Sequence, residues 1–208
     1  MKERVVCFID GFNLYHAIAK LKAPHLKWVN LYSLSSVFVR PQSQYLVDVH
    51  YFSAYADWLP QQKSRHIQYV KALMASKVSP VMGKFKIKDR NCPSCHHRWN
   101  GHEEKETDVN IALALLDLAY KDKYDHAFLV SNDSDLTPAI NMVRGNFPNK
   151  KITTIVPPHY THSNELIKAS SEKAKITIPH LERCLLPTII YDAGGNIIAT
   201  RPVEYNPP

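Results

Sequence analysis

The sequence predicts an α/β sandwich built on a mainly parallel central sheet. One observation is a short continuous apolar run, Val5–Ile9, which ends at Asp10 and is typical of a strand buried on both faces. A second is that similar runs at His126–Val130 and Lys151–Val156 alternate with segments whose apolar residues recur at helical spacing. Alternation of strands and helices favours a parallel sheet covered by helices.

The remaining elements follow from the same periodicities and from the β-branched and aromatic residues that favour strands. In chain order they are a helix over Leu14–Lys20, a strand over Val47–Ala56, a helix over Gln61–Ser76, a strand over Val78–Lys88, and helices over Lys105–Tyr120, Leu136–Gly145 and Ser163–Ser171. Gly83 predicts a bulge within its strand. The tail segment TIIYDAGGNIIATRP has two apolar pairs around a glycine turn, which indicates a hairpin.

These elements make one domain over residues 1–187, followed by a C-terminal hairpin and tail over residues 188–208. A chain of 208 residues can bury one full core. Residues 89–105 show no periodicity, carry two cysteines and three histidines, and are expected to be an inserted loop.

Composition and charge limit the classes of function. The chain is 45% hydrophobic and 22% charged, which is typical of a soluble globular protein. Its net charge of 26 − 19 = +7 favours a polyanionic partner. No apolar run approaches the roughly 20 residues of a membrane helix, and Asp10 ends the N-terminal apolar run too early for a signal peptide. We therefore expect a cytoplasmic protein with no membrane partner.

Acidic side chains are predicted to converge at one edge of the sheet. Asp10 ends the first strand, and Asp133 and Asp135 follow a second buried strand. Ligands of open α/β sheets bind at the carboxyl ends of the strands, where Asp108, in the first turn of the Lys105–Tyr120 helix, can join the other acids. Converging carboxylates repel one another unless a cation neutralises them, and their oxygens suit Mg²⁺ or Mn²⁺.

Polar neighbours of these acids are candidate catalytic or substrate-binding residues. Asn13, three residues past the first acid, could hold a metal-bound water or a phosphate, and Ser131 and Ser134 could do similar work. Lys105 precedes the mid-chain acid by three residues and would share its face of a helix, where it could offset phosphate charge. Each acid alone also has a structural explanation, as a strand end, a turn or a helix N-cap. The combination is what favours a metal site.

Three segments, in this order, resemble the NYN domain of the PIN-like nuclease superfamily, in its bacterial LabA group: FIDGFNLYHAI, EEKETDVNIALALLDLAY and AFLVSNDSDLTPAI. The resemblance spans roughly Met1 to Pro187 and implies a PIN-like three-layer α/β sandwich, bound Mg²⁺ or Mn²⁺, and ribonuclease activity. The residues that match the family's polar positions are Asp10, Asn13, Asp108, Asp133 and Asp135. Asn132 stands where glycine is usual, and Asn tolerates left-handed backbone better than most residues.

Cys92 and Cys95, in the segment CPSC, have the spacing of a structural zinc knuckle. His96, His97 and His102 are within reach as further ligands, and His102 is far enough along the chain to fold back on the pair. A second protomer could also complete the tetrahedron, which would make the protein a homodimer. The alternatives are a thioredoxin-type redox pair, which the polar flanking residues disfavour, and a loop with unligated thiols. Structural Zn²⁺ is the expectation.

Basic residues alternate along the predicted strand that leads into the insertion. Side chains two residues apart share a face, so one face would carry a positive row for an RNA backbone, formed by Lys84, Lys86, Lys88 and Arg90. Phe85 and Ile87 would then face the core. Trp99 could stack on unpaired bases. Exposed edge strands also carry lysines without binding anything.

These features together favour a hydrolase, an Mg²⁺- or Mn²⁺-dependent endoribonuclease whose substrate is RNA. The alternative is an RNA- or nucleotide-binding module of the same fold that does not cut. A phosphatase of the haloacid dehalogenase type needs a second Asp at position 12, where Phe12 stands. A Ser–His–Asp hydrolase would need a nucleophile elbow, which the sequence lacks.

Overall fold

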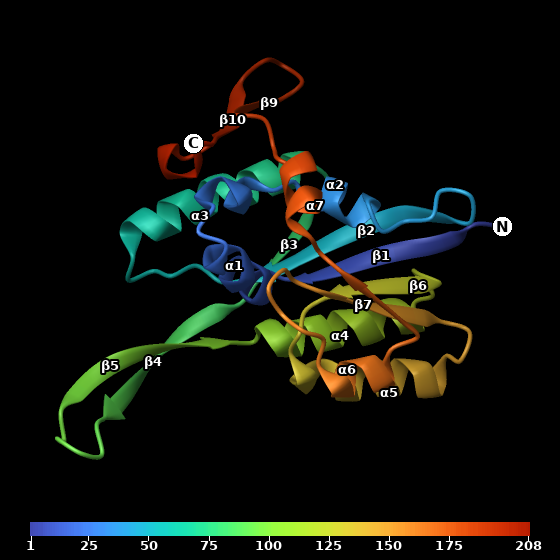
Figure 1. Ribbon diagram of the computed structural model, residues 1–208, viewed down its shortest axis with the longest axis horizontal. Coiled ribbons are helices and arrows are strands. Elements are labelled where there is room, and N and C mark those ends of the chain that lie inside the picture. Colours follow the sequence, from blue (N-terminus) through green and yellow to red (C-terminus); the bar gives the residue numbers. More distant parts are fainter.

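The computed structural model describes all 208 residues and is centred on a six-stranded sheet (Figure 1). The strand order is β3-β2-β1-β6-β7-β8. The strands are β1 (Glu3–Asp10), β2 (Gln44–Ser53), β3 (Ser79–Met82), β6 (His126–Val130), β7 (Lys151–Val156) and β8 (Glu172–Lys175). All neighbouring pairs are parallel, which confirms the predicted α/β class.

Helices cover both faces of the sheet and make three layers (Figure 1). One face carries α1 (Gly11–Lys20), α2 (Leu31–Ser36), α3 (Pro60–Ala75) and α7 (Ile178–Arg183), and the other carries α4 (Thr107–Tyr120), α5 (Thr137–Asn146) and α6 (Asn164–Ala169). Strand β1 supplies both cores because its side chains alternate between the two faces. Cys7 and Ile9 pack in one core, and Val6 and Phe8 pack in the other.

The chain leaves the sheet at Gly83, so the expected bulge is a break between two strands. Strand β3 ends at Met82, and the next residues begin a separate antiparallel pair. The Gly83 amide donates to the Ser53 carbonyl over 2.7 Å. A Cβ at Gly83 would lie 2.8 Å from the Lys105 carbonyl oxygen. Glycine is therefore needed where the two arms of the insertion meet the body.

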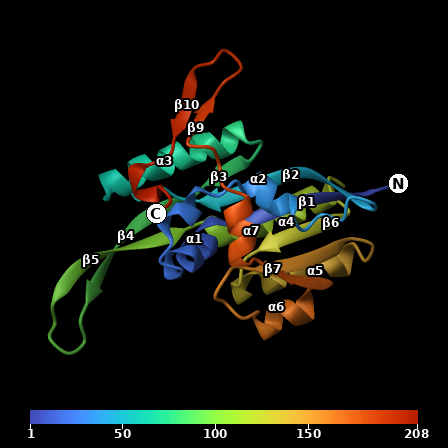
Figure 2. The same ribbon diagram turned by 45° about the horizontal axis from the view of Figure 1, so that its top comes forward.

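The insertion is a β-hairpin and not the expected loop at residues 89–105. Strands β4 (Lys84–Asn91) and β5 (Arg98–Lys105) pair from Lys84↔Lys105 to Asn91↔Arg98. The hairpin projects from the body in both views (Figures 1 and 2). Most of its residues are exposed or half-buried on both faces, so β5 lacks the apolar alternation by which a strand is normally recognised.

The C-terminal hairpin is present and packs against the outside of α3 (Figure 2). It consists of β9 (Ile189–Tyr191) and β10 (Ile197–Thr200), and two short 3-10 helices, η1 (Pro24–Trp28) and η3 (Val203–Tyr205), lie near it. A small core joins Trp28 and Ala72 to Ile190 and Ala199. The helices of this chain include none with the length and apolar character needed to cross a bilayer.

Candidate active site

The topology of the sheet creates a crevice between the carboxyl ends of β1 and β6. From β1 the chain moves outward through β2 and β3 on one side, then returns to β6 and moves outward through β7 and β8 on the other. Ligands of open α/β sheets bind at such a switch point. Asp10 is the last residue of β1, and Ser131 directly follows β6, so both residues lie at this crevice.

Asp10 is buried and its carboxylate is held by two hydrogen bonds. Its Oδ1 accepts from the Asn13 backbone amide over 2.9 Å, which makes Asp10 the N-cap of α1. Its Oδ2 accepts from the Ser131 hydroxyl over 2.9 Å. Only 4% of Asp10 is exposed. Asp10 therefore ends its strand, as the sequence suggested, and it also caps the helix that follows.

The segment after β6 is tied to the first helix by polar side chains. Asn13 Oδ1 accepts from the Asn132 amide over 3.2 Å, and Asn132 Oδ1 accepts from the Ser163 amide over 2.9 Å. The Asp133 amide donates to Ser131 Oγ over 3.1 Å. Asn13 and Ser131 thus act as orienting residues of the acidic site. The Asn132 side chain makes a contact that the usual glycine could not.

Asp108 joins Asp10 and Asp133 at this edge. It lies in the first turn of α4. The pKa of Asp10 is raised to about 6, mainly by burial; the hydrogen bonds from the Asn13 amide and the Ser131 hydroxyl oppose this rise, and the charges of Asp108 and Asp133 add to it. Burial also raises the pKa of Asp108 to about 6, with added repulsion from Asp133, Glu104 and Asp135. The carboxylates are thus close enough to disfavour each other's ionisation.

A large cavity opens beside these acids. It has a volume of about 1030 Å³ and is lined by 30 residues, of which 15 are hydrophobic. Asp10, Asn13, Asp108 and Asp133 all contribute to its wall. The cavity is large enough for a segment of a chain-like ligand rather than for a single small ion.

Glu104 is a site residue that the sequence analysis did not select. It lies in β5, lines the cavity and raises the pKa of Asp108. Its Oε1 accepts from both the amide and the hydroxyl of Thr107, the first residue of α4. Glu104 therefore fixes the start of the helix that carries Asp108. The sequence signal that could have identified Glu104 was its position three residues before Thr107, at the start of a predicted helix.

Lys105 does not share a helix face with Asp108, contrary to expectation. Glu106 adopts a left-handed backbone with φ of 82°, and α4 begins only at Thr107. Lys105 is the last residue of β5, and its Nζ lies 3.2 Å from a carboxylate oxygen of Glu103. The left-handed residue separates the strand from the helix, so helical spacing does not apply across it.

The predicted positive row exists, but it lies on the hairpin face that does not line the cavity. The opposite face supplies Phe85, His102 and Glu104 to the cavity wall. Lys84 Nζ lies 2.5 Å from Glu106, and Lys88 Nζ lies 3.1 Å from Glu103. The row comprises Lys84, Lys86, Lys88 and Arg90. The expected inward face is also only half correct, because Ile87 is 68% exposed.

Other cations line the cavity, and the sequence analysis did not single them out. They are Lys20 at the end of α1, Lys27 in η1 and Arg65 in α3. Lys20 Nζ lies 3.1 Å from the Tyr160 hydroxyl, and Lys27 Nζ lies 3.2 Å from the Tyr15 hydroxyl. These cations come from separate elements with no shared motif, so only the folded chain brings them together.

Ser134 and Asp135 lie in the short 3-10 helix η2 (Ser134–Leu136) and outside the cavity wall. The Asp135 amide donates to Asp133 Oδ1 over 3.0 Å. Asp135 is exposed, although its charge still raises the pKa of Asp108. Of the two acids in this motif, Asp133 alone faces the cavity.

The donor set fits a hard divalent cation. The candidate ligands are the carboxylate oxygens of Asp10, Asp108 and Asp133, which suit Mg²⁺ or Mn²⁺. No three His, Cys, Asp or Glu side chains converge tightly enough to enclose an ion by themselves. Mg²⁺ commonly takes one or two carboxylates and completes its shell with water and phosphate oxygens, which is the arrangement that this set can offer.

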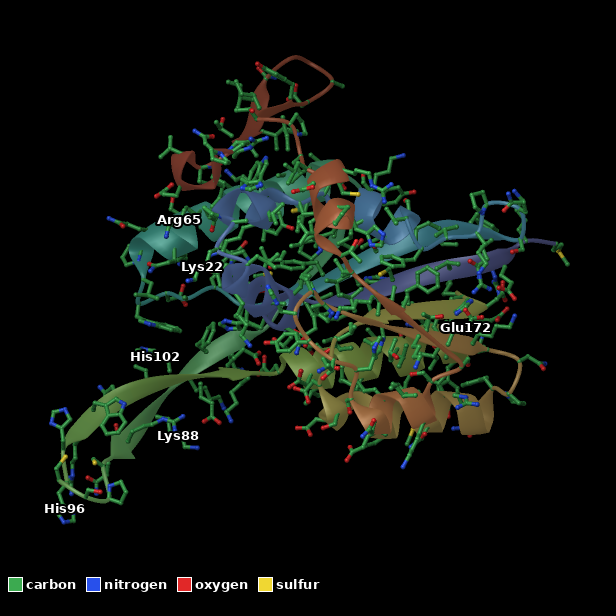
Figure 3. All side chains as sticks on the ribbon, viewed as in Figure 1. Lys22, Arg65, Lys88, His96, His102 and Glu172 are labelled. Carbon is green, nitrogen blue, oxygen red and sulfur yellow. The ribbon has the colours of Figure 1, made fainter.

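The structure does not bring His102 to the two cysteines. Cys92 and Cys95 lie in the turn of the hairpin, where backbone N–H groups of Cys95 and Ser94 lower the pKa of the Cys92 thiol. His102 pairs with Ile87 in the strands, well below the turn. Figure 3 shows His96 at the far end of the hairpin and His102 nearer the body. Structural zinc held by Cys92, Cys95 and His102 is therefore not supported.

The six-stranded parallel sheet and the acids at its switch point define an α/β protein with the fold of PIN-like nucleases. The family model described as "NYN domain" matches residues 4–176, most of the chain. The chain belongs to this family, as the three sequence segments indicated.

Two further similarities each cover about nine tenths of the chain. One is to 6-hydroxy-3-succinoylpyridine 3-monooxygenase HspA from Pseudomonas putida, which is 27% identical over 90% of this chain and 71% of that protein. The other is to the crystal structure of a protein of unknown function from Vibrio parahaemolyticus, with a TM-score of 0.55 and 20% identity over 89% of this chain and 97% of that one. The second similarity concerns the fold alone.

Proposed function

We propose that the protein is a metal-dependent ribonuclease that hydrolyses RNA phosphodiester bonds at the acidic site. One observation carries the proposal. A buried carboxylate, Asp10, lies at the switch point of the sheet, and its pKa is raised by burial and by the neighbouring Asp108 and Asp133. Such an arrangement costs stability unless a cation compensates it. Membership of the NYN family supports a nuclease role.

The chain's own residues would bind and orient the reactants. Asp10, Asp108 and Asp133 would hold Mg²⁺ or Mn²⁺, while Ser131 and the Asn13 amide keep the Asp10 carboxylate in place. When bound, such a cation supplies charge neutralisation at the phosphate and a water of lowered pKa. Glu104 holds the start of α4 through Thr107 and so maintains the position of Asp108.

The experiment is incubation of the purified protein with a mixture of labelled single-stranded and structured RNAs in Mn²⁺, Mg²⁺ or EDTA. We expect cleavage products with either cation and none with EDTA. Cleavage that persists in EDTA, after the protein has been freed of metal, would contradict the proposal. Binding without cleavage in every condition would favour the alternative, an RNA- or nucleotide-binding module of the same fold.

A second candidate is monooxygenation of a hydroxypyridine ring. The similarity to HspA over 90% of the chain suggests it, and the cavity includes aromatic side chains against which a planar ring can pack, among them Tyr51, Trp58 and Phe85. The reaction would need O₂ and a two-electron donor. Incubation with 6-hydroxy-3-succinoylpyridine, air and reduced nicotinamide nucleotide, followed by mass spectrometry, tests it. An unaltered ring after prolonged incubation would eliminate this candidate.

A further inference from the structure

Aromatic rings stack where the hairpin meets the body. The rings of Trp58 and His102 have centroids 3.7 Å apart and planes within 9° of parallel. Phe85 meets Trp58 edge-on at 4.6 Å, and Phe12 meets Phe85 edge-on at 5.5 Å. These four residues, here called the aromatic cluster, come from the loop before α3, from both hairpin strands and from α1.

The aromatic cluster and the acidic site share one cavity. All four of its residues line the cavity that Asp10 and Asp108 also line. Within the chain, Phe12 follows Asp10 by two residues, and His102 precedes Glu104 by two residues along β5. Residues two apart on a strand share a face, so the hairpin presents His102 and Glu104 to the cavity together.

Trp58 keeps accessible surface in spite of these contacts. It remains 36% exposed, whereas Trp28, the other tryptophan of the body, is fully buried. His102 supports its ring from one side, with the planes nearly parallel. A contact whose sole purpose was to hold the hairpin would gain from burying the whole indole, because burial of apolar surface stabilises the fold. Trp58 instead keeps part of its surface accessible and lines the cavity that the acidic site shares.

We propose that Trp58, supported by His102, binds one unpaired nucleobase of an RNA strand whose backbone passes the Asp10–Asp108 site. Every base has an aromatic face, so stacking of this kind tolerates any sequence but requires an unstacked base. A base within an A-form duplex is already stacked on its neighbours and cannot reach such a ring. The protein would therefore select single-stranded segments. This inference rests on the proposed function, because it names the form of RNA that the site takes.

The charges around the cavity suit a strand that leaves the stacking site along α1. Lys20 and Lys27 line the same cavity and have tyrosine partners in place of carboxylates. Lys20 lies eight residues after Phe12 on the helix, about 12 Å along its axis. The positive charges of both ammonium groups are therefore not offset by their partners. They can attract the phosphates of an RNA strand that also reaches the aromatic cluster.

The test measures binding in an Asp10→Asn background, where cleavage cannot consume the ligand. Dissociation constants are measured by fluorescence anisotropy, without added divalent cation, for a labelled single-stranded RNA and for the same RNA annealed to its complement. We expect Trp58→Ala to weaken single-strand binding about 5- to 150-fold, the usual effect of losing one base–aromatic stack, and to leave duplex binding unchanged. Trp58→Phe should retain most of the affinity.

The matched control is Trp99→Ala. The sequence suggested Trp99 as a base-stacking residue, but it lies on the hairpin outside the cavity wall, stacked on His97 and similarly exposed. Its loss should therefore leave both dissociation constants unchanged. Equal losses for Trp58→Ala and Trp99→Ala would overturn the inference, as would an unchanged constant for Trp58→Ala. A Trp58→Ala protein that loses duplex binding as well would also overturn it.

Failure of the inference and failure of the proposed function give different results. If the wild type binds single strands through Trp58 but never cleaves them, the stacking site stands and the nuclease function falls. If the wild type cleaves RNA and Trp58→Ala leaves KM unchanged, the nuclease function stands and the stacking site falls. If no RNA is bound or cut in any form, both fall.

Discussion

The Ser131 hydroxyl donates a hydrogen bond to Asp10 Oδ2 over 2.9 Å, across the switch point between β6 and β1. Both residues are almost completely buried. This bond lowers the pKa of Asp10 and so opposes the effect of burial, which raises it. Ser131 therefore helps to keep the carboxylate ionised and aimed, and several expected outcomes follow from that role.

Replacing Ser131 by Ala should weaken cation binding at the acidic site. The change removes a donor to Asp10 Oδ2, so the Asp10 pKa rises further and a larger part of its carboxylate is protonated near neutral pH. The measurement is the Mn²⁺ concentration that gives half-maximal RNA cleavage, which should increase several-fold. Ser134→Ala is the control, because Ser134 lies outside the cavity wall. Equal responses of the two variants would contradict this role of Ser131.

Replacing Asp10 by Asn should stabilise the metal-free fold near pH 7. Because the Asp10 pKa is raised to about 6 in the folded state, the folded protein binds a proton more tightly than the unfolded chain, and stability falls as pH rises from about 4 to 6. The expected gain for the variant is on the order of 1–3 kcal/mol at pH 7.

This gain should disappear below about pH 4, where Asp10 is neutral in both states. Urea unfolding of wild type and variant in EDTA at several pH values measures the difference. Saturating Mn²⁺ should raise the melting temperature of the wild type more than that of Asp10→Asn. A variant that is less stable at pH 7, or whose advantage grows toward acid pH, would show that burial of the charge is not costly.

Replacing Gly11 by Ala should destabilise the fold. A Cβ there would lie 2.6 Å from the Phe52 carbonyl oxygen and 2.5 Å from the Tyr51 ring, and the backbone oxygen can move little. We expect a loss of about 1–3 kcal/mol in the free energy of unfolding, typical of overpacking.

Gly145→Ala is the matched control, because a Cβ there meets nothing within 4 Å on helix α5. Alanine should stabilise that helix by about 0.5–1 kcal/mol. Thermal or urea unfolding should show that Gly11→Ala lowers the free energy of unfolding and that Gly145→Ala raises it. A Gly11→Ala protein as stable as the wild type would refute the steric argument.

Replacing His102 by Ala should not change the zinc content of the protein. His102 stacks on Trp58, and the hairpin turn alone provides Cys92 and Cys95. Metal analysis after purification without chelator, followed by dialysis, compares wild type, His102→Ala and a Cys92→Ser, Cys95→Ser double variant. If zinc were present in the wild type and lost in His102→Ala, His102 would be a zinc ligand, which would contradict its position away from the hairpin turn.

The sequence predicted the core strands well because their signal is local. The strands His126–Val130 and Lys151–Val156 have the predicted limits, and Asp10 stands at the end of β1. Continuous apolar runs are nearly unambiguous when both faces of a strand are buried. The short strand β8 and helices α2 and α7 were not predicted, since each has only four to six residues, too few to establish a period.

The hairpin was mispredicted for a different reason. Its strands are held mainly by their mutual backbone pairing and expose most side chains, so hydrophobic periodicity carried no information. The sequence proposed RNA contacts for the lysine face because its charges alternate along β4; in the structure Phe85 and His102, on the other face, line the cavity. Three-dimensional placement was also needed to find Trp58, which belongs to no motif of the acidic site, and to distinguish Glu104 from the other acids at the entrance of α4.

The measurement that tests the nuclease proposal most directly compares the RNA cleavage rates of wild type, Asp10→Asn, Asp108→Asn and Asp117→Asn in saturating Mn²⁺. Asp117 lies on α4 with Asp108 but outside the cavity wall, where it pairs with Lys121. We expect the first two variants to lose at least about 100-fold in rate, roughly 2.7 kcal/mol or more of transition-state stabilisation, and Asp117→Asn to match the wild type. If Asp10→Asn and Asp108→Asn cut RNA as fast as Asp117→Asn, the acidic site at the switch point is not where the protein acts.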